Sequence, residues 1–239
     1  MTEDFRNDIN SGNLPQVSLI VAPEWLSEHA IGHPADGMKL SADLIGVLAA
    51  NKTVYSKTAF ILNYDEGGQF FDHHWIPTPP VNDTDGKSNV PVTGEITTEA
   101  YYSIPAGNPI GLGFRVPLII VSPWTRGGYV YSGVADHTST LKFVERRFGI
   151  NVDNISPWRR EITSDLVEAF NFTHPDYSWP SNLPDTSGNW NESQRQCDNL
   201  PPPEVPREQH MPKQDRGTKK SRALPYNHDA SLSFNKDSK

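Results

Sequence analysis

The chain has 239 residues with a formal net charge of −8, and it contains a single cysteine, Cys197. The acidic balance argues against a nucleic-acid-binding protein, which normally presents a basic face, and one cysteine excludes an internal disulfide framework and any multi-cysteine metal site. No stretch approaches the roughly 20 apolar residues of a membrane-spanning helix, and the polar start lacks the apolar core of a signal peptide. The length suits one sizeable α/β domain followed by a tail.

The first part of the chain predicts a strand, a helix and a second strand. Residues 1–16 are polar, and we expect them to lie on the surface. The apolar run at 17–21 predicts a buried strand, and the helical spacing of apolar residues over about 38–50 predicts a helix that Asp36 caps. The run at 58–63 predicts a second strand. Because such a unit is a right-handed crossover between parallel strands, the pattern favours a mostly parallel sheet with flanking helices.

The middle of the chain combines a long loop with a third strand and a helix. Residues 74–113 are rich in proline, glycine and short polar side chains, and a loop of this length is usually functional or disordered. The apolar run at 116–121 predicts a buried strand. A helix capped by Thr138 or Ser139 is expected to follow and to end near Phe148.

The last third of the chain changes in composition. A shorter helix is predicted over about 159–169, and beyond residue 172 prolines cluster while apolar periodicity disappears. We therefore predict a folded domain at 1–172 and an extended proline-rich tail at 173–239.

Two adjacent carboxylates, Asp65 and Glu66, follow the predicted strand at 58–63 directly. Ligands of open α/β sheets bind in the crevice beyond the carboxyl ends of the strands. Neighbouring acids repel each other unless a cation or a shared proton offsets them, so a divalent metal ion is a natural partner. A solvated acidic turn is the equally weighted alternative. In a parallel sheet the loop after residues 17–21 would lie at the same edge, which would place His29 near the two acids.

Three histidines come directly after acids, at Glu28-His29, Asp72-His73 and Asp136-His137. Histidine and carboxylate side chains together are what metal-assisted hydrolysis of a phosphoric ester requires. One such pair is weak evidence, because a buried histidine commonly donates to a carboxylate for structural reasons alone. Three pairs next to predicted strands or helices favour a hydrolytic site.

The chain also carries a series of ordered motifs. They are Ser27-Glu28-His29, Asn63 to His73, Gly111 to Pro117, Val121 to Trp124, Gly127-Gly128, Asp136 to Ser139 and Ser156 to Arg160. In this order they resemble the phosphoesterase family, which comprises the non-haemolytic, phosphatidylcholine-type phospholipases C and related acid phosphatases of the alkaline-phosphatase-like superfamily. The resemblance covers about residues 13–172, and the proline-rich tail is similar to the linker after the catalytic domain of the phospholipases.

The resemblance implies an alkaline-phosphatase-like α/β/α sandwich and one divalent metal ion held by Asp65 and Glu66. Carboxylate ligands suit calcium, magnesium or manganese, and added histidine admits zinc or iron. By the same resemblance His29 contacts the phosphoryl group, and Asp136 and His137 lie near the site as further catalytic candidates.

Three more residues take supporting positions in the family pattern. The resemblance places Asp72 and His73 behind the residues that contact the metal. Arg115 either pairs with a buried carboxylate, which we favour, or meets an anionic substrate.

The sequence also departs from the family pattern. Residues 1–16 hold no counterpart of the family's Glu-Asn metal-binding pair or of its threonine or serine nucleophile, and Ser18 lies inside a predicted strand. We therefore expect the C-terminal part of a catalytic domain, incomplete at its N-terminal side, with an unknown nucleophile and little turnover on its own.

The resemblance favours a phospholipase C that cleaves phosphatidylcholine-like lipids to diacylglycerol and a phospho-headgroup. An acid phosphatase acting on small phosphomonoesters, or a non-catalytic remnant, are the alternatives. The expected partner is a phospholipid or a small phosphoester, with room for transient contact with a membrane surface and no nucleic acid. Sequons such as those at Asn51, Asn82, Asn171 and Asn191 favour a secreted or cell-surface location for the full-length protein.

Overall fold

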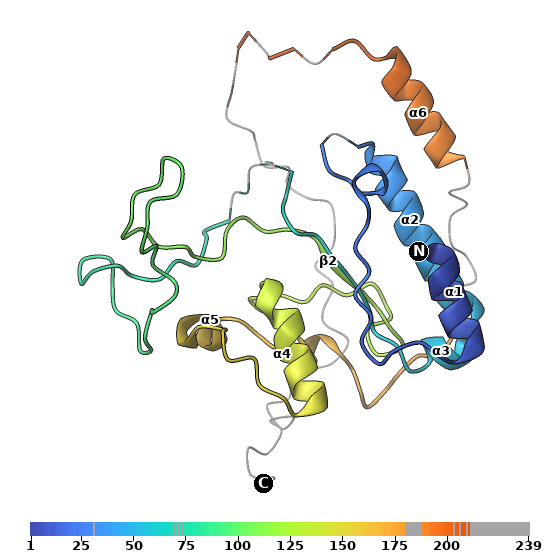
Figure 1. Cartoon of the computed structure of the whole chain (residues 1–239), viewed down its shortest axis with the longest axis horizontal. Helices are drawn as coiled ribbons and strands as arrows, with labels where there is room; N and C mark the ends of the chain where they lie inside the picture. The colour runs from blue at the N-terminus through green and yellow to red at the C-terminus, as the bar shows by residue number, and fades with distance from the viewer. Residues whose placement is uncertain are drawn as a thin grey trace.

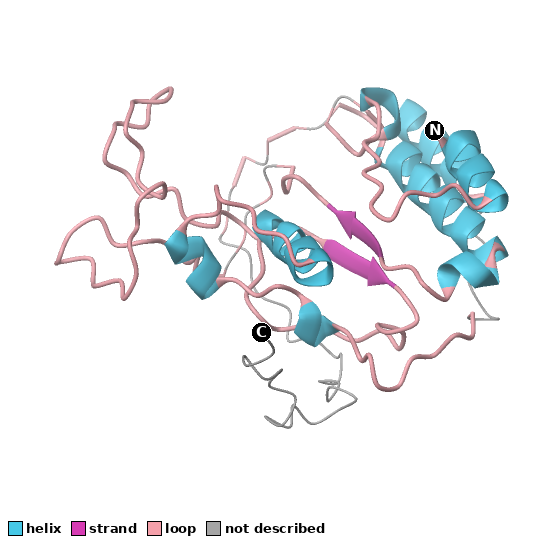
Figure 2. Cartoon of the chain, turned by 60° about the horizontal axis from the view of Figure 1, so that its bottom comes forward, coloured by secondary structure: helices cyan, strands magenta, loops and turns pink. Residues whose placement is uncertain are grey.

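The computed structural model describes residues 1–30, 32–68, 70, 72, 74–179, 188–202, 204–205, 207–208 and 210. Its elements along the chain are α1 (Thr2–Ser11), η1 (Glu24–Leu26), α2 (Pro34–Ala50), α3 (Lys52–Tyr55), β1 (Phe60–Asn63), β2 (Leu118–Val121), α4 (His137–Phe148), α5 (Pro157–Ile162), η2 (Val167–Ala169) and α6 (Asn189–Asn199). The two strands lie between the α1–α2 pair and α4 (Figures 1 and 2). The architecture is therefore mixed helix and sheet, with long loops between the elements.

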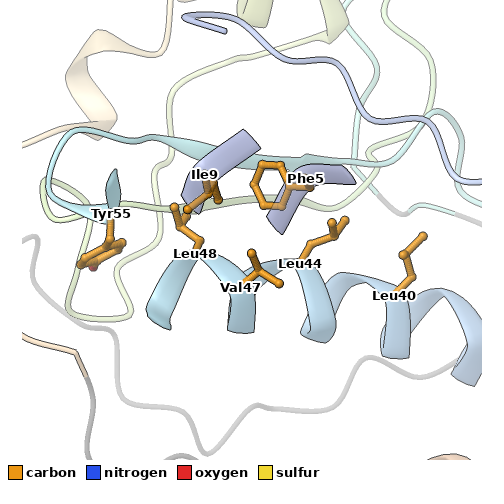
Figure 3. Packing of buried hydrophobic residues seen from close by; sticks show 7 residues of the cluster. All are labelled: Phe5, Ile9, Leu40, Leu44, Val47, Leu48 and Tyr55. Carbon is orange, nitrogen blue, oxygen red and sulfur yellow. The ribbon is translucent and has the colours of Figure 1, made fainter. Parts of the chain in front are cut away.

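The α1–α2 cluster is the apolar core of the N-terminal region. Its members are the buried side chains of Phe5, Ile9, Leu40, Leu44, Val47, Leu48 and Tyr55 (Figure 3). Phe5 and Ile9 are four residues apart, so they share one face of α1 and point at α2. The prediction that residues 1–16 lie on the surface is confirmed for most of α1 and is wrong for Phe5 and Ile9, whose buried side chains form an apolar stripe within an otherwise polar segment.

Helix α2 confirms the helix predicted over about 38–50 but begins earlier. Pro34 occupies the first turn, where its fixed φ angle and missing N–H are tolerated. The His33 Nδ1 atom accepts a hydrogen bond of 3.1 Å from the Ala35 N–H. His33 therefore caps the helix, and the prediction that Asp36 does so is wrong, since Asp36 lies inside the first turn.

Strands β1 and β2 pair in antiparallel orientation, so the predicted parallel pairing is wrong for the strands that the structure describes. Phe60 lies opposite Val121 and Asn63 opposite Leu118. A short apolar run indicates burial but carries no information on strand direction, which depends on the path of the connecting chain. As a consequence, the carboxyl end of β1 lies beside the start of β2, and the two carboxyl ends lie at opposite ends of the pair.

Residues 17–21 are extended but form no strand, contrary to the prediction. Ile20 packs against the α1–α2 cluster, whereas Val17, Leu19 and Val21 point to solvent. Ser18 is exposed as well, so Ile20 is the one side chain of this run that faces the core. Among the described residues no strand pairs with this segment.

Helix α4 confirms the helix predicted up to Phe148, with a different cap. The Asp136 side chain accepts from the Thr138 N–H, and the Ser139 hydroxyl accepts from the Asp136 N–H, which together form a capping box. The cap is therefore Asp136 and not Thr138 or Ser139.

The helix predicted over about 159–169 is confirmed only in part. Helix α5 ends at Ile162, and η2 begins at Val167. Between them Leu166 adopts a left-handed conformation with φ of 63°, which interrupts helical geometry.

Residues 173–179 still contact the part of the structure that precedes them. The Trp179 ring meets Tyr55 edge-on with ring centroids 5.0 Å apart, and Arg126 forms an ion pair of 2.6 Å with Asp176. Farther on, α6 contacts α2. The boundary at 172/173 stays a prediction, and most of the predicted tail lies outside the described residues.

Candidate active site

The Asp65–Glu66 turn follows β1, and Tyr64 is the one residue between them. Both side chains are exposed. Asp65 Oδ1 accepts from the Glu66 N–H at 3.1 Å, and Glu66 Oε2 accepts from the Gly68 N–H at 2.7 Å. Gly68 has φ of 63°, a left-handed conformation that glycine adopts without steric cost and that allows this close turn. Backbone N–H groups thus orient the two carboxylates.

Tyr64 joins the loops that carry the candidate residues. Its hydroxyl donates to Glu28 Oε1 at 2.8 Å, and its carbonyl oxygen accepts from His137 Nε2 at 2.9 Å. Burial and the Glu28 carboxylate raise the pKa of Tyr64 to about 12, so the phenol stays protonated and serves as a donor. The Ser27–His29 loop, the Asp65–Glu66 turn and the start of α4 therefore meet around Tyr64.

Glu28 is held against the first turn of α2. A Cβ on Gly37 would lie 2.5 Å from Glu28 Cγ, so only glycine permits this approach. Glu28 is half-buried, and its neighbour His29 is exposed. The Ser27 hydroxyl further shapes the loop, because it accepts from the His29 N–H and donates to the Glu24 carbonyl.

His137 has one ring nitrogen engaged and one available. A carbonyl oxygen only accepts, so Nε2 carries the proton in the bond to Tyr64. Nδ1 has no hydrogen-bond partner among the described residues. In the tautomer with its single proton on Nε2, the Nδ1 lone pair can accept a proton or a ligand.

An ionic network of Glu95, Asp136, Ser156 and Arg159 holds the start of α4. Arg159 donates through Nη1 to Asp136 Oδ2 at 2.6 Å, and through Nε and Nη2 to the two oxygens of Glu95 at 2.9 and 2.7 Å. The carboxylates of Glu95 and Asp136 are almost fully buried. The other oxygen of Asp136 accepts from the Thr138 N–H at the cap of α4, so both oxygens are engaged. Asp136 therefore positions the residue that follows it, His137.

Asp72 and Arg115 form a two-pronged ion pair. Arg115 Nε and Nη2 donate to the two oxygens of Asp72 at 2.8 and 2.7 Å, and the Arg115 N–H adds a third bond of 3.1 Å. These hydrogen bonds hold the pKa of Asp72 well below its usual range. The pairing with a carboxylate is the role we favoured for Arg115, although its own side chain is 60% exposed. His73 lies outside the described residues.

A cavity of about 680 Å³ brings several of the predicted residues together. Asp72, Arg115, Asp136 and His137 line it, as does Asn63 at the end of β1. Aromatic side chains complete its wall, namely Trp75, Phe114, Tyr129 and Tyr131. The volume suits a small organic ligand.

The donor set of Asp65 and Glu66 fits part of a metal shell. Each carboxylate has one oxygen bound by a backbone N–H and a second with no hydrogen bond from the described residues, and hard oxygen donors suit divalent cations. Within the described part of the chain no group of three histidine, cysteine, aspartate or glutamate side chains could hold a metal ion. The pair would therefore supply only some of the ligands of a metal ion, and a complete shell needs more.

Sequence reasoning missed the residues that connect the site. Glu28 and Arg159 lie within recognised motifs, but no role was assigned to them. Glu95 lies 64 residues from Arg159 in a loop without any local signal for an ion pair. Tyr64 also lies within a recognised motif, that of Asn63 to His73, but no role was assigned to it.

Comparison with known proteins identifies the relatives of this chain. The sequence model of the phosphoesterase family matches residues 1–151. The non-hemolytic phospholipase C of Burkholderia pseudomallei is 44% identical over 93% of this chain, and the hemolytic phospholipase C of Pseudomonas aeruginosa is 39% identical over 97%. Phospholipase C B of Mycobacterium tuberculosis is 40% identical over 72% of the chain. In each case the match covers 32% of the relative, so the chain spans about a third of their length.

None of the helices that the structure describes is both long and apolar enough to cross a bilayer.

Proposed function

This chain belongs to the phosphoesterase family, and we propose that it contributes to a phospholipase C-type hydrolase that cleaves phosphatidylcholine-like lipids to diacylglycerol and a phospho-headgroup. The observation that carries the proposal is the junction at Tyr64. It links the loop that carries His29, the turn of Asp65 and Glu66, and His137, and of these residues His137 lines the cavity of about 680 Å³. Similarity to three phospholipases C over most of the chain supports the same activity.

The roles follow from the chemistry of the side chains. Asp65 and Glu66 would hold one divalent metal ion, which when bound neutralises negative charge on phosphoryl oxygens. His29 would contact the phosphoryl group. His137, whose Nδ1 is available, would exchange a proton with the reacting group while Tyr64 fixes its Nε2.

The surroundings keep these groups in place. Arg159 holds Asp136 at the cap of α4, and Arg115 neutralises Asp72 at the wall of the cavity. An acid phosphatase acting on small phosphomonoesters is the second candidate, and the open cavity near His137 would admit such a substrate equally. A secreted or cell-surface location of the full-length protein stays a prediction from the sequons.

Two measurements on the purified chain test this proposal. The first is calorimetric titration with calcium, magnesium, manganese and zinc. We expect one of them to bind, and the Asp65→Asn and Glu66→Gln variants to lose that binding. Asp43→Asn is the matched control, because Asp43 is an exposed acid on α2 that pairs with Lys39. Unchanged affinity in Asp65→Asn contradicts the metal assignment.

The second measurement compares a chromogenic phosphocholine ester with a chromogenic phosphomonoester in the presence of the metal that binds. Preference for the phosphocholine ester supports the phospholipase activity, and preference for the monoester supports the phosphatase. If a folded and metal-loaded chain hydrolyses neither, the non-catalytic alternative is correct for this polypeptide.

A further inference from the structure

The hairpin of residues 95–110 projects away from the strands and helices (Figures 1 and 2). Its two arms are hydrogen-bonded: the Thr97 N–H donates to the Asn108 carbonyl at 2.9 Å, and the Ile110 N–H donates to the Glu95 carbonyl at 2.8 Å. At its tip Tyr101 and Ile104 exchange two backbone hydrogen bonds of 3.0 and 2.9 Å. The projection is therefore an ordered element with its own backbone bonds.

The tip of this hairpin presents apolar side chains to solvent. Tyr102 is 91% exposed, Tyr101 is 67% exposed and Ile104 is 50% exposed. The two tyrosine rings meet edge-on with centroids 4.6 Å apart. Exposed aromatic and apolar side chains gathered on one projection mark an interaction site, whereas single ones scattered over a surface do not.

Tyr102 holds an unusual backbone conformation. Its φ of 49° lies in the left-handed region, which side chains other than glycine, asparagine and aspartate rarely adopt. Such strain persists where the surrounding structure enforces it, and it gathers at functional sites. Here it accompanies the most exposed of the three side chains.

The charge of the hairpin is as distinctive as its shape. No charged residue occurs from Ala100 to Phe114, although the chain as a whole carries a net charge of −8. An acidic protein is repelled by an anionic surface, and a tip without basic side chains carries no attraction to one. Glu99, at the edge of this uncharged stretch, adds to that repulsion. Tyrosine side chains place an apolar ring and a polar hydroxyl at a lipid–water boundary, where they are enriched. These features fit a zwitterionic lipid surface.

The base of the hairpin is fixed to the candidate site. Glu95, 3% exposed, bonds Arg159, and Arg159 bonds Asp136 directly before His137. A surface bound at the tip would therefore hold the cavity at a set position relative to the lipid.

We propose that the tip of this hairpin, formed by Tyr101, Tyr102 and Ile104, docks the protein onto a zwitterionic lipid surface. The benefit of such docking rests on the proposed phospholipase function, whereas the docking itself does not require turnover. The occupant is a bilayer rather than a protein, because the stretch from Ala100 to Ile110 that forms the tip carries no charge and exposes two tyrosines.

The test is co-sedimentation of the chain with phosphatidylcholine vesicles. We expect binding that changes little with salt, and a fall of about tenfold or more in the partition coefficient of the Tyr101→Ser/Tyr102→Ser double variant. Tyr177→Ser is the matched control, because Tyr177 is 54% exposed outside the hairpin. It should bind like the unaltered chain.

A second variant keeps the test independent of damage to the fold. Tyr102→Trp should increase partitioning, because tryptophan has a larger apolar ring for the same boundary. Near-ultraviolet circular dichroism and the thermal midpoint establish that each variant is folded.

Several outcomes would overturn the inference. They are the absence of vesicle binding by the unaltered chain, equal binding by the double variant, and binding only to anionic vesicles at low salt. Tyrosine-dependent self-association without vesicle binding would mean that the tip docks a second copy of the chain.

Vesicle binding and the ester assay, measured on the same chain, together separate this inference from the proposed function. Vesicle binding without hydrolysis of a soluble phosphocholine ester would leave the docking role intact and count against the enzymatic one. Hydrolysis of the soluble ester without vesicle binding would do the reverse.

Discussion

The α1–α2 cluster and the α4–α5 region are held together by different forces. In the first, Phe5 and Ile9 pack on apolar side chains of α2, and Leu48 is fully buried. In the second, charged contacts are added to buried apolar side chains such as Trp158 and Phe170. Arg159 joins Glu95 and Asp136, and Arg160 joins Glu145. The apolar contacts tolerate changes of shape, whereas each charged contact depends on a specific partner.

This difference bears on where the candidate site lies. His137 follows Asp136, which belongs to the ionic network, whereas Tyr64 and Glu28 lie between that network and α2. Charge-assisted hydrogen bonds fix orientation more precisely than apolar packing does. The α1–α2 cluster thus acts as a scaffold, and the charged region sets the geometry of the site.

The largest effect is expected from Arg159→Met. It removes the partner of two buried carboxylates, and breaking a buried pair in this way costs about 4 kcal/mol. Urea unfolding followed by circular dichroism gives the value. Arg126→Met is the control, because Arg126 pairs with the exposed Asp176, and it should cost less than about 1 kcal/mol. Similar losses for the two variants would mean that the network adds little beyond a surface ion pair.

Leu48→Ala is expected to come next. The side chain is 0% exposed, and a leucine truncated in a core loses about 3 kcal/mol through lost burial and the cavity left behind. The same unfolding experiment measures it. Leu141→Ala on α4 is the counterpart, since that side chain is 46% exposed and should cost no more than about 0.5 kcal/mol.

The stability of the chain at low pH should depend on the charged contacts of the α4–α5 region. Hydrogen bonds from Arg160 and from the Val152 N–H lower the pKa of Glu145 from 4.5 to about 2. The contribution of Glu145 to stability is therefore complete above pH 4.5 and is lost as the pH falls towards 2. We expect the thermal midpoint of the chain to fall over this interval.

Glu145→Gln provides the check on that assignment. The variant should begin with a lower midpoint at pH 7 and lose less of it on acidification, because its side chain does not titrate. An unchanged slope between pH 4.5 and 2 would place the acid sensitivity at other carboxylates, such as Asp72, whose pKa is also lowered.

The smallest effect is expected from Tyr64→Phe. It removes the hydrogen bond to Glu28, and such a bond contributes about 1 kcal/mol. Denaturant unfolding measures this loss, and Tyr177→Phe should show none. A stability equal to that of the unaltered chain would mean that the phenol does not secure the Ser27–His29 loop.

Part of the fold could be predicted from the sequence because local periodicity carries it. The apolar spacing in α2 and α4 indicated both helices, and short apolar runs indicated β1 and β2. Strand direction could not be predicted, since Phe60 and Val121 would look alike in parallel and antiparallel pairs. Helix α1 was missed because two apolar side chains, Phe5 and Ile9, were its only signal among charged neighbours.

The candidate site shows the same limit at longer range. Motif order pointed to Asp65, His137 and Arg115, which are local features. The partners that hold them come from distant segments: Glu28 lies 36 residues from Tyr64, and Glu95 lies 64 residues from Arg159. Only folding brings such pairs together, so sequence spacing gave no warning of them.

The most direct test of the central claim, that three loops meet at Tyr64 to build one metal-dependent site, is a titration of the ¹⁵N-labelled chain with Mn²⁺. The ion is paramagnetic and suits carboxylate oxygens. We predict that the amide resonances of Glu66, Glu28 and His137 broaden together at the same low concentration, and that Asp65→Asn abolishes the broadening of all three. Broadening at Glu66 while Glu28 and His137 stay sharp, or broadening that persists in Asp65→Asn, would contradict the claim.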